Sequence, residues 1–545
     1  MPLPIVRDWP GRVRAAWPLA AAMAAFLALV GALLVLSLRH TGGHVIYALD
    51  DPYIHMAMAK HVALDGTWGV SPDRFSSSSS SLLWTALLAA LFAVGGVHDG
   101  IPLLMNVAAG LALLWIVARR LRPTPAGRHP VYLWLVLTAI VLATPMPALV
   151  FVGQEHLLHA CVAVLFLDLG AGWLAPVGAS AARGAMFARL AALAAVLPLV
   201  RYEALFLVAL VALATLARGW WREAGILGAS AAVPVLLYGA FSAWHGWYWL
   251  PNSVLVKGAR PGFATVHEAI RSLGYVAYSR LTSLPAIGFL VTLVVVFGAM
   301  RIARATFDGS FRRLALFAAL ALAHLQYAQP AAFWMFRYEA YLVAVGLFVL
   351  ANPLLELATS LTPGPWPRMR QWALGALAAL LVVSSPLPDR AARSFAIVPR
   401  ATANIYEQQY QMGLFLARYY ERAPVALNDI GAASYLSDID CLDLVGLADM
   451  TVARRVLNGW FAYDDIEEIA AERGIRIAIV FDSWFHGRIP PRWQKAGSWT
   501  IDDNAVEGDD TVTFYAVRPE ELGPLRSRLR EFAASLPDDV SVDRR

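Results

Sequence analysis

Charged residues are scarce in this chain. They make up 15% of its 545 residues, whereas hydrophobic residues make up 59%. A soluble globular protein carries about 25% charged residues, so this composition excludes a soluble enzyme and indicates a polytopic membrane protein. Cysteine is rarer still, because only Cys161 and Cys441 are present. Two cysteines exclude a disulfide framework.

The few charges are divided unevenly along the chain. Residues 1–385 hold 14 of the 39 acidic and 26 of the 44 basic residues, a formal charge of +12. Residues 386–545 hold the other 25 acidic and 18 basic residues, a formal charge of −7. We therefore predict a membrane domain over 1–385 and a soluble domain over 386–545. The positive excess requires no nucleic acid partner, because arginines flank membrane spans.

Eleven apolar segments are candidates for membrane spans of ~20 residues. The first is longer than the apolar core of a signal peptide, so we expect no cleavage there and a helix that stays in the protein. The two segments that flank Arg201 could be partial spans that meet inside the membrane. The eleven segments cover residues 15–38, 101–118, 130–150, 156–175, 186–200, 203–217, 224–243, 283–300, 314–328, 340–358 and 371–385.

Arginines set the expected orientation. Arg7, Arg12 and Arg14 precede the first span and place the N-terminus in the cytoplasm. The apolar run 82–94 is too short to span, and we predict that it lies along the membrane surface within a first loop over 39–100. If residues 82–94 are not counted as a span, the arginines of every short loop fall on the cytoplasmic side. The first loop and the soluble domain are then extracytoplasmic.

The first loop contains two segments with recognisable patterns. Residues 53–64 are predicted to form a short amphipathic helix with Ile54, Met58 and Val62 on one face. Six consecutive serines follow at 76–81. They are typical of a flexible linker, or their last members would cap a helix over the apolar run that comes next.

The soluble domain is predicted to be mixed α/β. Residues 423–447 indicate a strand, a turn and a second strand. Residues 475–481 and 511–517 are further strand candidates, and 519–536 indicate a terminal helix with acids first and bases last. The turn Asp429-Ile430-Gly431 favours a structural role over ligand binding. This domain shows no zinc, P-loop or dinucleotide motif.

Ionisable residues gather on the outer side of the predicted spans, where they are costly and commonly functional. Asp50 and Asp51 follow the first span closely. A carboxylate there could take a proton from a substrate hydroxyl, bind a cation or anchor a loop. Arg201, Arg337 and Lys257 could neutralise a phosphate. A carboxylate base and these cations together fit the transfer of a sugar from a lipid phosphate, which is the leaving group.

The candidate site therefore has a catalytic and a binding group of residues. Either aspartate could be the base, and Asp51 is favoured because it starts the predicted helix. The other could orient it or, with His55, hold a divalent metal, although a surface position is the simpler interpretation of that histidine. The two Arg-Tyr-Glu triplets could instead form salt bridges between helices. The donor phosphate or sugar is expected to bind to Arg201, Arg337, Lys257, Glu155, Asn252, Tyr53 and Glu203.

Several short motifs, taken in order, resemble those of the GT-C superfamily of integral membrane glycosyltransferases. ALDDPYIHMAMAKHVALDGTWGV followed by SSSSSSLLWTALL is similar to a branch that includes the mycobacterial terminal arabinofuranosyltransferases. GQEH, LPNSVLVKGA and the RYE triplets at 201–203 and 337–339 correspond to further motifs of this branch. The resemblance implies a helical membrane fold with an outer C-terminal domain, a polyprenyl-phosphate sugar donor, and Asp50 or Asp51 as the base.

We therefore predict a hexosyl- or pentosyltransferase of the bacterial cytoplasmic membrane. It would move a sugar from polyprenyl phosphate to a cell-envelope glycan or lipid on the outer face, with donor, acceptor and bilayer as its partners. Three alternatives stay open. A transporter or flippase would carry polar residues at the bilayer midplane and often internal repeats. A ligase would use a lipid-diphosphate donor, and a non-catalytic scaffold would bind glycan through its soluble domain.

Overall fold

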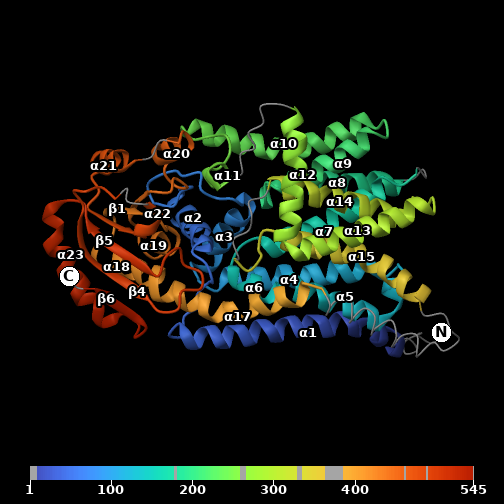
Figure 1. Ribbon diagram of the computed structural model, residues 1–545, viewed down its shortest axis with the longest axis horizontal. Helices are drawn as coiled ribbons and strands as arrows, with labels where there is room; N and C mark the ends of the chain where they lie inside the picture. Colours follow the sequence, from blue (N-terminus) through green and yellow to red (C-terminus); the bar gives the residue numbers. More distant parts are fainter. Residues whose placement is uncertain are drawn as a thin grey trace, which may run out of the picture.

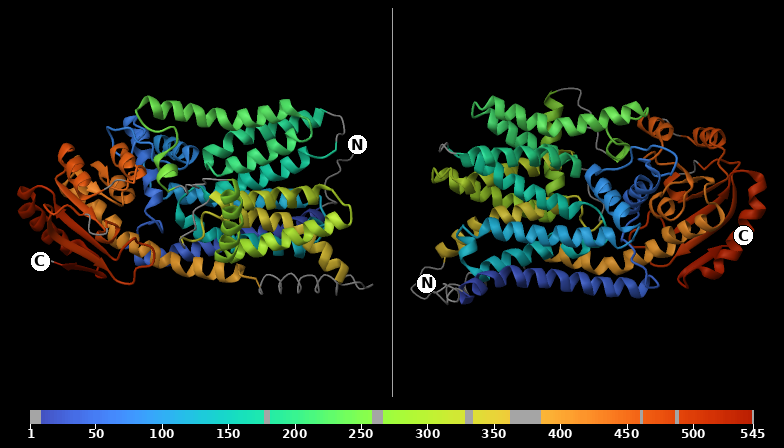
Figure 2. Two further views of the ribbon diagram at one scale, coloured as in Figure 1. Left: turned by 45° about the horizontal axis from the view of Figure 1, so that its top comes forward. Right: turned by 180° about the vertical axis from the view of Figure 1, so that it is seen from behind.

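The computed structural model describes residues 9–176, 181–257, 266–327, 334–361, 385–459, 462–485 and 489–543. Most of its helices run along one long axis and form a bundle, and a sheet with short helices lies at one end of this bundle (Figure 1). The N-terminal end of the first helix lies at the opposite end (Figure 2). The predicted combination of a helical membrane part and a C-terminal α/β domain is therefore confirmed.

The bundle is built from apolar helices. Eight spans among the described residues are long and apolar enough to cross a membrane. The helices that make them are α1 (Trp9–His40), α4 (Ile101–Leu121), α5 (Pro130–Ala143) with α6 (Met146–Val152), α7 (His156–Trp173), α8 (Ala181–Val200), α10 (Trp221–Trp244), α13 (Pro285–Ala303) and α15 (Ala340–Leu361).

The remaining predicted spans have different outcomes. The segment 203–217 forms α9 (Ala204–Leu216), whose 13 residues are too few to cross a bilayer alone. The segment 314–328 lies in α14 (Gly309–Tyr327), which is not among the eight spans. The segment 371–385 falls almost entirely outside the described residues. The run 82–94 forms α3 (Leu82–Gly95), about 21 Å long at 1.5 Å per residue, which agrees with the prediction that it does not span.

The C-terminal part contains one six-stranded sheet. Its strand order is β2-β1-β3-β5-β4-β6, with β1 parallel to β2 and β3 and the other pairs antiparallel. The predicted strand–turn–strand at 423–447 is wrong in one respect, because a short helix replaces the turn. The elements are β1 (Pro424–Leu427), α19 (Gly431–Leu436), β2 (Asp440–Asp443), α20 (Met450–Leu457), α21 (Tyr463–Glu472), β3 (Ile477–Val480), α22 (Asp482–Phe485), β4 (Gln494–Ile501), β5 (Thr511–Ala516), α23 (Leu522–Phe532) and β6 (Val540–Asp543).

Three helices lie between the bundle and this sheet domain: α2 (Asp51–Asp65), α3 and α11 (Asn252–Lys257). Helix α2 packs against both α3 and α19, so most of its side chains are buried and it does not lie free on a membrane surface. The serine run is buried as well, and the linker interpretation is wrong. Its last member caps α3 as predicted, because the Ser81 hydroxyl accepts the Trp84 N–H at 3.4 Å.

A single hydrophobic core joins these loop helices to the sheet domain. Tyr53 and Met56 of α2 and Trp84 of α3 belong to the same buried cluster as Trp499 of β4 and Phe415 of α18 (Gln411–Tyr419). Burial of such side chains contributes about 1.5–3 kcal/mol each. The first loop and the sheet domain are therefore packed together as one unit.

A long helix connects the bundle to the sheet domain. Helix α17 (Leu387–Ile405) packs along α1 and continues through one π-helical turn, η2 (Tyr406–Tyr410), into α18. The predicted boundary at 386 stays a prediction, since α17 begins just after it and still contacts the bundle.

Candidate active site

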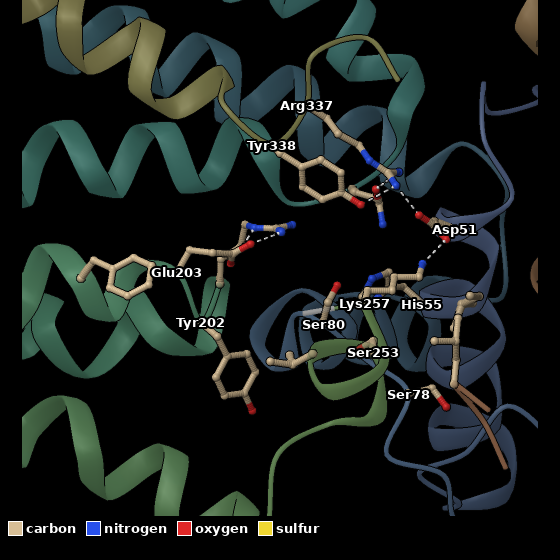
Figure 3. Close-up of a pocket in the computed structure, with 16 residues that line it drawn as sticks. Asp51, His55, Ser78, Ser80, Tyr202, Glu203, Ser253, Lys257, Arg337 and Tyr338 are labelled. Carbon is tan, nitrogen blue, oxygen red and sulfur yellow. Dashed lines mark hydrogen bonds and ion pairs between the residues drawn. The ribbon is translucent and has the colours of Figure 1, made fainter. Parts of the chain in front are cut away.

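One cavity of about 310 Å³ opens where α2, the serine run, α11 and three turns of the bundle meet. Asp51 lies on one side of this space and Glu203 on the other (Figure 3). Most of the side chains around it are polar, in a protein with few charges. The polar lining residues are Asp51, His55, Ser78, Ser80, Gln154, Arg201, Tyr202, Glu203, Ser253, Lys257, Arg337 and Tyr338.

Two cations converge on Asp51, the first residue of α2 (Figure 3). Lys257 Nζ donates to Asp51 Oδ1 at 3.2 Å, and Arg337 Nη2 donates to Asp51 Oδ2. The same guanidinium donates to Gln154 Oε1 at 2.8 Å and to the Tyr338 hydroxyl at 3.0 Å. Three acceptors thus fix its orientation, in the forked geometry that suits arginine.

These cations decide the protonation of Asp51. Burial by itself would raise the pKa of this carboxyl, but Lys257 and Arg337 outweigh burial and hold its pKa well below its ordinary value. Asp51 is therefore ionised at neutral pH. It can accept a proton, although its basicity is low for as long as both cations face it.

Arg201 lies in the turn between α8 and α9 and is paired with two carboxylates. Its Nη1 donates to Glu155 Oε1 at 2.6 Å, and its Nη2 donates to Glu203 Oε1 at 2.7 Å. These are the contacts that the salt-bridge interpretation of this triplet predicts. Because two carboxylates already compensate its charge, Arg201 is a weaker candidate for binding a phosphate than Lys257 or Arg337.

Replacing Glu155 with glutamine should destabilise the fold. Glu155 and Arg201 are both buried, and removing one partner leaves the arginine with less compensation. Losing a buried partner costs about 3–5 kcal/mol, and we expect the lower end because Glu203 remains. Thermal unfolding in detergent measures the loss. Glu203→Gln should cost less, since that side chain is 31% exposed, and equal losses would contradict the primary role of Glu155.

The second triplet is divided between two tasks. Arg337 faces the cavity, whereas Glu339 accepts a hydrogen bond from Arg390 Nη1 of α17 at 2.7 Å. Glu339 and Arg390 are both buried. This pair ties α17 to the start of α15, so Arg337 and Tyr338 of the triplet are left for the site.

Four of the predicted site residues do not line the cavity. Glu155 binds Arg201 as described above, and Asp50 faces the sheet domain. The Tyr53 hydroxyl accepts the Tyr47 N–H at 3.1 Å. Asn252 Nδ2 donates to the carbonyl oxygen of residue 446 at 2.9 Å. The predicted residues that do line it are Asp51, His55, Arg201, Glu203, Lys257 and Arg337.

The surface interpretation of His55 is wrong, because the side chain is buried and its Nδ1 lies 2.8 Å from the Thr85 hydroxyl. Backbone N–H groups of the sheet domain bind Asp50, and Lys257 and Arg337 bind Asp51. No group of three His, Cys, Asp or Glu side chains is arranged to hold a metal in the described part of the chain. The predicted metal set of Asp50, Asp51 and His55 therefore has no structural support.

Sequence reasoning missed the hydroxyl groups of the site. Ser78 and Ser80 of the serine run and Ser253 of α11 lie along one wall (Figure 3). In an extended segment every second side chain points the same way, which is the signal that could have identified Ser78 and Ser80. The Ser253 hydroxyl is buried and has no hydrogen-bond partner within the described residues. Gln154 and Tyr338 were missed too, although each adjoins a predicted residue.

Comparison with sequence families gives one match. A domain of unknown function (DUF8728) matches residues 403–515, which run from the end of α17 into the sheet domain as far as β5. The curated proteins contain no match to this chain.

Solved structures give matches over most of the chain. ArnT from Cupriavidus metallidurans bound to undecaprenyl phosphate is 14% identical, with a TM-score of 0.52 over 91% of this chain and 98% of that one. ArnT from the same organism in the apo state is 13% identical, with a TM-score of 0.50 over 92% and 99%. The Archaeoglobus fulgidus oligosaccharyltransferase in complex with Zn and sulfate is 11% identical, with a TM-score of 0.47 over 94% and 74%, too distant to support an argument.

These likenesses concern the fold. This chain shares the fold of ArnT over most of its length, and the predicted GT-C-like fold is confirmed. The resemblance to the mycobacterial arabinofuranosyltransferase branch stays a prediction.

Proposed function

We propose that this protein is a membrane glycosyltransferase that moves a sugar from polyprenyl phosphate to a hydroxyl of a cell-envelope glycan or lipid. One observation carries the proposal: the Asp51 side chain is bound by both Lys257 and Arg337 at the wall of a cavity. The fold supports it, because a neighbour with the same fold, ArnT, has been solved with undecaprenyl phosphate bound.

The donor phosphate would bind at Lys257 and Arg337. Two cations facing one carboxylate leave one positive charge in excess, which attracts an anion and forms charge-assisted hydrogen bonds with it. Lys257 remains accessible to a ligand, since its side chain is 40% exposed. The phosphate would then share these cations with Asp51.

Phosphate binding would thereby make Asp51 a stronger base. With Lys257 and Arg337 turned towards phosphate, the pKa of Asp51 rises and its carboxylate becomes more basic. The acceptor hydroxyl oxygen attacks the anomeric carbon, the bond from that carbon to the phosphate oxygen breaks, and the hydroxyl proton passes to Asp51. Polyprenyl phosphate leaves with its charge held by the two cations.

The serine wall would face the sugar. Ser78, Ser80 and Ser253 line the cavity on the side formed by the serine run and α11 (Figure 3). Hydroxyl groups can both donate to and accept from the hydroxyls of a sugar ring. A rotation of the Ser253 side chain would bring its buried, unpartnered hydroxyl to the donor, where it would gain a hydrogen bond.

The sheet domain and the cavity would lie on the outer side of the membrane. Arg120 and Arg313 both pair with Asp168, about three turns along α7 from the end that meets the cavity. Basic residues gather on the cytoplasmic side of membrane proteins. The arginine-rich end of the bundle is thus the expected cytoplasmic end, opposite the site.

Replacing Lys257 with methionine should shift the acid limb of the pH profile of kcat/KM to higher pH. Lys257 lowers the pKa of Asp51, so its removal raises that pKa, and the reaction needs the ionised carboxylate. Pre-steady-state or initial-rate profiles of both proteins measure the shift. Lys495→Met is the matched control, because that lysine is similarly exposed but lies on β4. Superimposable profiles for Lys257→Met and the unmodified protein would contradict the proposal.

A transfer assay tests the function itself. Purified protein is given radiolabelled polyprenyl-phosphate sugars and an extract of envelope glycans and glycolipids as acceptor. Transfer of label supports the proposal. Transfer only from a polyprenyl-diphosphate glycan would indicate a ligase. Movement of the lipid from one leaflet of a proteoliposome to the other, without sugar transfer, would indicate a flippase. Either result would overturn the proposal.

A further inference from the structure

Asp50 and Asp51 are consecutive, yet they bind different parts of the molecule. Asp50 is 7% exposed and faces the sheet domain. Its Oδ2 accepts the Gly431 N–H at 2.6 Å, and its Oδ1 accepts the Ala432 N–H at 2.7 Å. Both donors are the first two residues of α19. Asp51 faces the cavity, so the peptide between the two aspartates joins the site to the sheet domain.

The contact depends on a close approach at Gly431. A Cβ atom there would lie 2.2 Å from the backbone oxygen of Asp50 and 2.6 Å from its Oδ2. The three atoms nearest to that position all belong to Asp50. Any larger residue at 431 would therefore displace Asp50 first. The Asp429-Ile430-Gly431 turn therefore has the predicted structural role, because its Gly431 N–H binds a side chain of the same protein.

Further acids surround Asp50. Gln409 of the π-helical turn η2 donates to Asp429 Oδ2 at 2.9 Å and to Glu507. Burial raises the pKa of Asp50 to about 6 and also raises those of Asp429 and Glu507. The side chains of Asp50 and Asp429 are hydrogen-bonded, which lowers the pKa of Asp50 and raises that of Asp429. Acids buried together cost free energy, so other contacts must keep this junction closed.

Those other contacts come from α2. The Tyr53 and Tyr435 rings lie 5.9 Å apart, and Lys60 Nζ donates to the Tyr435 carbonyl oxygen at 2.8 Å. Lys60 also pairs with Asp438 at 2.8 Å. Because these residues belong to the shared hydrophobic core or border it, α2 has a fixed rotation and position against the sheet domain.

We propose that the sheet domain positions Asp51 through Asp50, and that this contact serves the transfer step and not donor binding. Consecutive Cα atoms are about 3.8 Å apart, so a displaced Asp50 takes Asp51 with it. A misplacement of about 1 Å in a catalytic group costs about 10²-fold in rate. The inference rests on the proposed function, in which Asp51 takes the proton. Residues 403–515, the segment that matches a sequence family, contain the whole Asp50-binding turn.

Two single variants and their combination test this positioning role. Asp50→Asn loses one of the two backbone bonds, because its amide nitrogen cannot accept an N–H. Gly431→Ala displaces Asp50 from the other side. We expect each to lower kcat for transfer at least tenfold, with polyprenyl phosphate bound within twofold of the unmodified affinity. The double variant should be no slower than the slower single variant, since both break one contact.

Matched controls and contrary outcomes make the test decisive. Asp65→Asn at the far end of α2 and Gly523→Ala, whose Cβ would meet no atom within 4 Å, should keep kcat. The inference fails if Asp50→Asn keeps kcat within twofold, if it loses phosphate binding through any cause, or if the losses of the two single variants multiply. If the unmodified protein neither binds polyprenyl phosphate nor transfers sugar, the proposed function has failed instead.

Discussion

Asp51→Asn is expected to lower kcat for sugar transfer by about 10³-fold, within the range that general base catalysis contributes. Asparagine keeps the size of the side chain and can still accept the Arg337 hydrogen bond, but it cannot take up a proton. Polyprenyl-phosphate binding should persist or strengthen, because Lys257 and Arg337 lose a competing negative charge. Initial rates and lipid binding in detergent measure both effects.

The control for this variant is Asp65→Asn, the same substitution at the other end of α2, which should leave the rate unchanged. Correct folding of the variant is checked by its thermal unfolding transition in detergent. A folded Asp51→Asn protein with an unchanged rate would remove Asp51 from the mechanism. A rate loss that increased donor concentration restores would make Asp51 a binding residue.

Arg337→Lys is expected to lower kcat/KM by about 10²-fold, although it keeps the charge. Arg337 donates at once to Asp51, Gln154 and Tyr338. A lysine has one compact ammonium group that cannot reproduce this planar fork, so its hold on both the carboxylate and the phosphate weakens. Two lost charge-assisted bonds at about 1.5 kcal/mol each account for this factor. Steady-state kinetics with varied donor concentration measure it.

Arg313→Lys is the matched control, because Arg313 pairs with Asp168 at the opposite end of the bundle. It should leave kcat/KM unchanged. If Arg337→Lys transferred sugar at the unmodified rate, the forked geometry of Arg337 would be irrelevant and the phosphate would have to bind elsewhere.

The membrane part of the fold could be predicted because a bilayer imposes a simple requirement. A span needs about 20 apolar residues, and α1, α4, α7 and α10 meet it with little ambiguity. The same requirement assigned α3 correctly as too short. Strands β3 and β5 were predicted from their apolar, β-branched runs, whereas β4 and β6 were missed because their sequences are more mixed.

The residues that were misplaced are those buried by partners far away in the sequence. Lys60 and Tyr435, which join α2 to the sheet domain, are 375 residues apart. No local sequence pattern predicts a contact of this kind. For the same reason the burial of the serine run and of His55 was not predicted, and they were interpreted as a linker and a surface residue. Asp51, Lys257 and Arg337 could be predicted as members of one site because an ionisable side chain beside a bilayer is costly and commonly functional. That Asp50 binds the sheet domain could not be predicted.

The lipid product of one turnover tests the central claim most directly. Purified protein, a polyprenyl-phosphate sugar and acceptor are mixed, and the lipid is identified by mass spectrometry while the transferred sugar is counted by label. We expect one polyprenyl monophosphate for each sugar transferred, and release about 10³-fold slower with Asp51→Asn. Sugar transfer without release of polyprenyl monophosphate, or release of polyprenyl diphosphate in its place, would contradict it.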